Sequence, residues 1–72
     1  MREAQMRDSD VIAEALKDLH KNETLEEAMG RAVRKRGGKY EDYLRMMANI
    51  RDIAYSKGVT PLEAAKEIAG QP

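Results

Sequence analysis

The sequence contains no cysteine, phenylalanine or tryptophan, and only two of its 72 residues are proline. Without cysteine, the chain forms no disulfide and offers no thiolate to a metal. Its core must therefore be built from Leu, Ile, Val, Met, Ala and Tyr. The absence of cysteine fits a reducing compartment, and no apolar run reaches the roughly 7–15 residues of a signal-peptide core. We expect a cytoplasmic protein with no membrane partner.

The sequence also lacks an excess of charge of either sign, because 13 basic and 13 acidic residues cancel. A chain without a net field is not expected to coat nucleic acid. The distribution is uneven, however: residues 1–30 carry a net charge of −4, residues 31–39 carry +5, and residues 40–72 carry −1. We expect a single domain over residues 1–72, whose core supplies only roughly 3–5 kcal/mol of net stability. Association with a second copy would widen this narrow margin.

Two helix-start signals organise the chain. In Thr24-Leu25-Glu26-Glu27 and Thr60-Pro61-Leu62-Glu63 the threonine hydroxyl is placed to accept a bond from the backbone N–H three residues on. The glutamate at that third position is placed to accept a bond from the threonine N–H, which completes a capping box. Proline suits the first helical position because its missing N–H has no partner there. Each signal therefore predicts the second helix of a helical hairpin.

Periodicity and stop signals place the four helices at about residues 10–21, 24–36, 40–57 and 61–69. Ser9 is the predicted N-cap of the first helix, and the order of residues 1–8 is left open. Glycines at positions 37, 38 and 58 are expected to close the second and third helices. The buried face of the fourth helix is expected to carry Leu62, Ala65, Ile68 and Ala69. The predicted fold is all-α, with four short helices forming two tandem hairpins packed around the long third helix.

The third predicted helix has more apolar surface than one buried face requires. At about 100° per residue, its large apolar side chains cover well over half of the circumference. We considered two explanations: the helix lies at the centre of the fold, or it also contacts a partner. Methionine and tyrosine on a helix surface are typical of protein interfaces. The candidate interface residues are Tyr40, Leu44, Met46, Ala48 and Tyr55. The sequence thus predicts a non-enzymatic interaction module that binds a protein partner or a second copy of itself.

The alternative function is a small nucleic-acid-binding regulator. Its phosphate or anion contacts would be Arg31, Arg34, Lys35, Arg36 and Lys39, although basic residues at the end of a helix also complement its dipole. The spacing around Gly58 resembles a helix-turn-helix, with Ala54 before the turn and Val59 after it. The second helix, however, opens with Thr60, Pro61 and Leu62, which do not read base edges. A third possibility, an inhibitor that occupies another protein's active site, has the same surface features as the first.

Catalytic chemistry has little basis in the sequence. His20 is the only histidine, and neither Ser9 nor Ser56 lies near it in the sequence. No nucleophile, base and orienting group can be assembled from these residues. The paired acids fall in first helical turns, where they stabilise the helix dipole. We therefore predict no enzymatic activity, no metal site and no cofactor.

Overall fold

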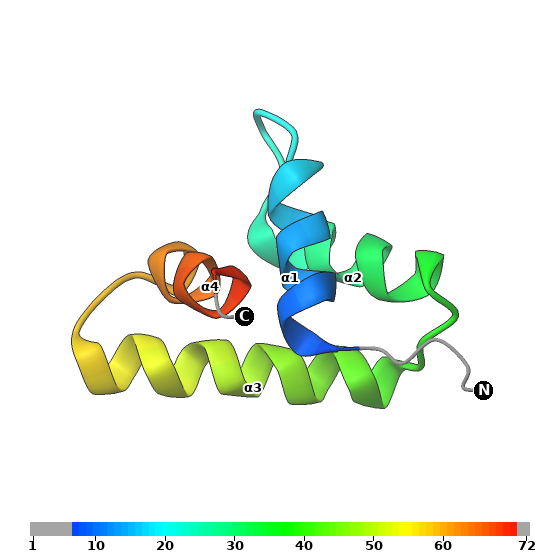
Figure 1. Ribbon diagram of the computed structural model, residues 1–72. Coiled ribbons are helices and arrows are strands. Elements are labelled where there is room, and N and C mark those ends of the chain that lie inside the picture. Colours follow the sequence, from blue (N-terminus) through cyan, green and yellow to red (C-terminus); the bar gives the residue numbers. More distant parts are fainter. Residues whose placement is uncertain (1–6, 71–72) are drawn as a thin grey trace.

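A computed structural model describes residues 7–70, and within this range it contains helices and no strand. The helices are α1 (Asp8–Lys17), α2 (Leu25–Lys35), α3 (Tyr40–Lys57) and α4 (Pro61–Ala69) (Figure 1). The predicted all-α, four-helix class is confirmed. The open question about residues 1–8 mostly concerns residues 1–6, which lie outside the described residues.

Both predicted threonine caps form. The Thr24 hydroxyl accepts from the Glu27 N–H at 3.1 Å, and the Glu27 carboxylate accepts from the Thr24 N–H at 3.0 Å. This reciprocal pair confirms the capping box that begins α2. At α4 the Thr60 hydroxyl accepts from the Glu63 N–H at 3.1 Å, and Pro61 occupies the first helical position. The Glu63 carboxylate does not accept from the Thr60 N–H, so the capping box predicted there is only half formed. Local sequence therefore determines where both of these helices begin.

The predicted glycine caps are present as well. Gly37 and Gly58 have left-handed backbones, with φ of 76° and 68°. The Gly38 N–H donates to the Val33 carbonyl at 2.9 Å and the Gly37 N–H donates to the Arg34 carbonyl at 3.0 Å. This bond pattern closes a helix by satisfying carbonyls that have no partner within the helix. It ends α2 sharply and starts the turn that leads into α3.

The bounds predicted for α1 are wrong at both ends. The helix begins at Asp8, so Ser9 lies inside the first turn and is not the N-cap. The carboxylate of Asp8 accepts two bonds from Arg45 of α3, at 2.8 and 3.0 Å, which fixes this end of the helix. The other end stops at Lys17, four residues earlier than predicted. There the Arg31 guanidinium donates to the Asp18 carbonyl at 2.8 Å, so a side chain of α2 takes the place of the next helical N–H.

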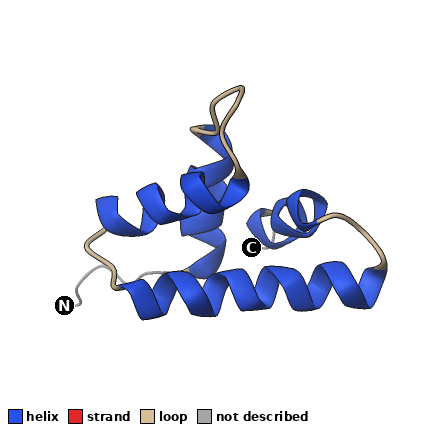
Figure 2. Cartoon of the chain, turned by 180° about the vertical axis from the view of Figure 1, so that it is seen from behind, coloured by secondary structure: helices blue, strands red, loops and turns tan. Residues whose placement is uncertain are grey.

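The four described helices enclose one core. α1 packs on α2 and α4, and α3 packs on the same two helices. Figures 1 and 2 show α3 along one edge of the molecule, with α2 over its N-terminal half and α4 over its C-terminal half. The third helix is therefore peripheral and not central. The fully buried larger side chains are Val11, Ile12, Met29, Val33, Met46, Met47 and Ile50.

Helix α4 buries Ala65 and Ile68 as the sequence predicts, but it does not bury Leu62. Leu62 is 36% exposed, whereas Ala64 and Ala65 are completely buried. Alanine has little side chain, so a helix that turns alanines inward approaches its neighbours closely. Here α4 packs through Ala64, Ala65 and Ile68, and this face leaves Leu62 at the rim. None of the described helices combines the length and apolar character needed to cross a bilayer.

Candidate protein-binding surface

The outer face of α3 carries an apolar strip that no other described helix covers. Tyr55 is 92% exposed, Tyr40 is 71% exposed and Leu44 is 46% exposed, with Ala48 exposed between them. At about 100° per residue these four positions span roughly 80° of the helix. We call Tyr40, Leu44, Ala48 and Tyr55 the α3 strip. Among the residues that the structure describes, the large hydrophobic side chains that are exposed are these two tyrosines, Leu44 and Leu62.

One predicted interface residue lies elsewhere. Met46 is completely buried and belongs to the core, because it faces the side of α3 that packs on the rest of the chain. From the sequence alone, a central third helix and a partner-binding third helix explained its wide apolar arc equally well. The structure divides the arc: Met46, Met47 and Ile50 form the core side, and the α3 strip forms the exposed side.

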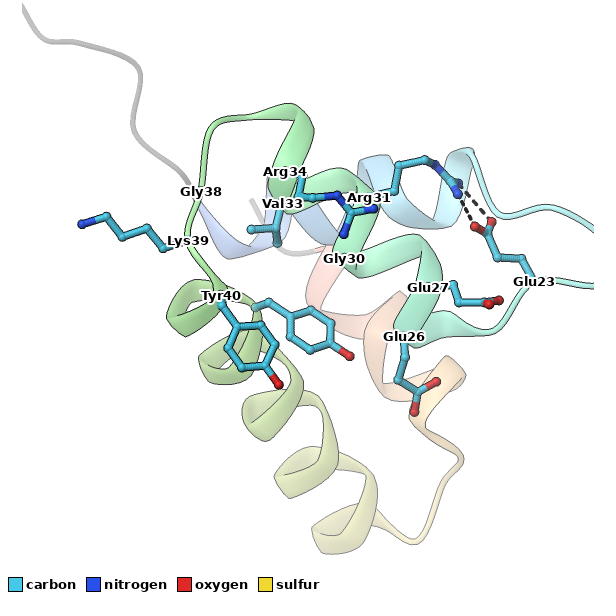
Figure 3. A pocket seen from close by; sticks show the side chains of 11 residues that line it. Glu23, Glu26, Glu27, Gly30, Arg31, Val33, Arg34, Gly38, Lys39 and Tyr40 are labelled. Atoms are coloured by element: carbon cyan, nitrogen blue, oxygen red, sulfur yellow. Dashed lines mark hydrogen bonds and ion pairs between the residues drawn. The ribbon is translucent and has the colours of Figure 1, made fainter.

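An open groove of about 710 Å³ lies beside the N-terminal end of the α3 strip, between α2 and α3 (Figure 3). The rings of Tyr40 and Tyr43 stack within it, with centroids 5.7 Å apart. Arg34 extends over one end of the groove, and Glu26 and Glu27 lie at the other end. The groove is therefore aromatic on one side and polar at both ends, with opposite charges at those ends.

Gly30 lines the same groove and has no structural reason to be glycine. It lies inside α2, where glycine costs roughly 0.8–1 kcal/mol relative to alanine. A Cβ at this position would meet only the Arg34 guanidinium, at an ordinary contact distance of 3.5 Å. The backbone φ is not positive, so no strained conformation requires glycine either. A missing side chain that faces a groove leaves room for the close approach of another molecule.

The basic segment is mostly neutralised inside the chain. The Arg36 Nε lies 2.7 Å from a Glu14 carboxylate oxygen, and the Lys35 Nζ lies 3.3 Å from the other oxygen. Both cations lower the pKa of Glu14, and the Arg36 hydrogen bond is the larger cause. Arg31 is paired with Glu23. Arg34 and Lys39 have no carboxylate within 4 Å among the described residues. Three of the five predicted phosphate contacts therefore already have an acidic partner in α1 or the α1–α2 turn.

A clamp that the sequence did not predict holds the α1–α2 turn. Arg31 binds both carboxylate oxygens of Glu23 (Figure 3). It also donates to the Asp18 carbonyl, so one guanidinium joins α2 to both ends of the turn. The Glu23 carboxylate also accepts from the His20 N–H at 3.1 Å. The Glu23 side chain is only 12% exposed. The Arg31 hydrogen bonds, followed by the His20 N–H, lower the pKa of Glu23 from 4.5 to about 2.

This clamp predicts acid sensitivity. Because the pKa of Glu23 is lower in the folded chain than in the unfolded chain, the unfolded chain binds the extra proton first. The stabilisation is complete above about pH 4.5 and is lost as the pH falls towards 2. We expect Glu23→Gln to be less stable than the unmodified chain at pH 7, with a difference that shrinks over this range. Urea unfolding followed by circular dichroism measures it. Glu63→Gln is the matched control, and parallel pH profiles for Glu23→Gln and the unmodified chain would contradict the clamp.

The remaining candidate sites lie in exposed turns and at exposed helix ends. The His20 side chain is exposed, and the backbone N–H of this residue bonds within the turn, to the Glu23 carboxylate. Residues 7–70 contain no cluster of three or more His, Asp or Glu side chains placed to hold a metal ion. At the α3–α4 turn, Lys57 is paired with Glu67 at 2.5 Å, and the exposed start of α4 presents Glu63. This arrangement does not favour a phosphate backbone. The absence of enzymatic activity stays a prediction.

The exposed side of α3 and the adjoining groove are thus the surface features that most need a functional explanation. Comparison of the chain with known protein families, with curated proteins and with solved structures finds no significant match.

Proposed function

We propose that the protein is a non-enzymatic interaction module whose docking surface is the α3 strip, with a protein partner or a second copy as its ligand. The supporting observation is Tyr55, a large amphipathic ring that is 92% exposed in a chain with only three aromatic residues. Tyrosine is enriched in interfaces because it supplies a large contact area at a low entropic cost. A small domain that exposes this area, instead of burying it, forgoes stability that a partner would restore.

Nucleic-acid binding is the weaker proposal. This proposal was based on five basic residues without acidic neighbours in the sequence. In the folded chain, however, three of them have a carboxylate partner: Arg31, Lys35 and Arg36. An ion pair lowers the positive potential that attracts a phosphate backbone. The two residues of this segment that have no acidic partner within residues 7–70, Arg34 and Lys39, supply few phosphate contacts. The cytoplasmic location expected from the composition likewise stays a proposal.

A photo-crosslinking amino acid tests the docking surface directly. We expect the probe at position 55, in the full chain expressed in its own cell, to give a discrete covalent adduct to another protein or to a second copy. The same probe at Ala13, which is exposed on α1 and lies outside the α3 strip, is the control. Adducts at neither position, or equal adducts at both positions, would contradict the proposal.

A further inference from the structure

Two charged side chains of the groove beside Tyr40, Glu26 and Arg34, have no ion-pair partner among the described residues. Glu26 is exposed at its acidic end and has no basic group within 4 Å among the described residues. The Glu27 carboxylate, beside it, is used in the capping box. The acidic end therefore favours a ligand that brings a cation across the stacked tyrosines, where the faces of the rings also attract positive charge.

The chain itself carries such a cation on the outer side of α3. Arg51 is exposed and has no carboxylate within 4 Å among the residues that the structure describes. At about 100° per residue, Arg51 lies roughly 20° from Tyr40 around α3. Both residues therefore lie on the edge of the α3 strip that borders the groove, but about 16 Å apart along the helix at about 1.5 Å per residue. Arg51 does not line the groove of its own molecule.

Resting on the proposed function, we infer that the ligand of the α3 strip is a second copy of this chain, paired with antiparallel α3 helices about a two-fold axis. In a two-fold antiparallel pair, each edge of one helix meets the same edge of the other, so the Arg51 edge of one copy faces the Tyr40 edge of the other. The register that places Ala48 of one copy against Leu44 of the other also places Arg51 at the level of Tyr40 and Glu41. The contact then forms twice.

The side chains fit this register. Ala48 is the smallest residue of the α3 strip and lies near the crossing point, where a small side chain allows the helices to approach closely. In a helix, long side chains lean towards the N-terminus, so the Arg51 guanidinium of one copy leans towards the acidic end of the other copy's groove. It passes over Tyr40 and approaches Glu26, and the missing side chain of Gly30 leaves space there. Tyr55 of the same copy packs beside Tyr40.

The charge of the whole chain favours this partner over a strongly charged one. The formal net charge is zero, so two copies approach without mutual repulsion. The two ends of the groove carry opposite charges, so a complementary surface must carry both a positive and a negative charge. The surface of α3 does so with Arg51 and Asp52. The interface is thus expected to combine apolar burial at Leu44, Ala48 and Tyr55 with a charge contact at each end.

Charge reversal tests both the partner and the register. We expect Arg51→Glu and Glu26→Lys each to weaken dimerisation by at least about tenfold, because each reversal places like charges together twice. The chain that carries both substitutions re-forms the pair with its charges exchanged, and its dimerisation constant returns towards that of the unmodified chain. Sedimentation equilibrium of the full chain at low and high salt measures all four dissociation constants.

Two matched controls separate this contact from general effects of charge. Lys21→Glu makes the same change of charge as Arg51→Glu at an exposed turn position, and Glu63→Lys repeats Glu26→Lys in the first turn of another helix. Both are expected to dimerise normally. If the double variant dimerises no more tightly than the single variants, the proposed register is wrong. If the unmodified chain is monomeric but the probe at position 55 captures another protein, the second copy is wrong and the proposed function stands.

Discussion

Ile50→Ala is expected to unfold most of the protein at 25 °C. Ile50 is completely buried at the centre of α3, and its side chain belongs to the single core that all four helices share. Removing the larger part of a buried aliphatic side chain costs roughly 2–5 kcal/mol, because transfer energy is lost and a cavity is left behind. A domain of this size has roughly 3–5 kcal/mol of net stability. The loss is therefore comparable with the whole free energy of unfolding.

Circular dichroism at 222 nm, combined with urea titration, measures this effect. Ile50→Val removes one methylene and is expected to cost roughly 0.5–1.5 kcal/mol, so this variant stays folded and serves as the graded control. The titration should be run at two protein concentrations, because dimerisation stabilises the folded chain by mass action. Ile50→Ala with an unchanged urea midpoint would show that Ile50 is not part of the core.

Tyr55→Asp is expected to abolish association while leaving the helical content nearly unchanged. The ring is 92% exposed, so the folded monomer loses almost no packing when it is removed. In the interface, the same substitution deletes the largest apolar contact and introduces a charge that would be buried without a partner. Leu44→Asp should act in the same direction, with a small loss of monomer stability because Leu44 is half buried.

The next residue provides a matched control. Ser56→Asp introduces the same charge in the same turn of α3, but at about 100° from Tyr55 and away from the α3 strip. Both substitutions have the same unfavourable interaction with the helix dipole. Size-exclusion chromatography with light scattering should report loss of association for Tyr55→Asp and normal association for Ser56→Asp. Unfolding of Tyr55→Asp would place the ring in the core of the chain, and equal behaviour of both variants would remove the α3 strip as the interface.

The parts of the fold that local chemistry determines were predictable from the sequence. Thr24 and Thr60 begin their helices through hydrogen bonds that span three residues, and Gly37 and Gly58 end theirs through a positive φ. The bounds of α1 were not predictable in this way. They depend on Arg45 and Arg31, side chains that are distant in sequence from the helix ends that they hold.

The site was predictable only in part, for the same reason. The apolar strip on the third helix follows from helical periodicity, but which part of the wide arc is buried depends on where α2 and α4 lie. The neutralisation of the basic segment depends on contacts such as Arg36 with Glu14, 22 residues apart. One local signal was present and unused: Gly30 is a glycine inside a capped amphipathic helix, and it marks the groove.

The central claim is that two copies of the chain associate through the α3 strip. Sedimentation velocity of the purified chain, at low and high salt and with and without a short random DNA duplex, tests this claim most directly. We expect a dimer that persists at high salt and ignores the duplex, because apolar burial on α3 is not screened by ions. A chain that stays monomeric throughout would contradict a second copy as the ligand of the α3 strip, and a chain that shifts onto the duplex only at low salt would contradict the α3 strip as the binding surface. The second result would instead assign the binding surface to Arg34, Lys39 and their basic neighbours.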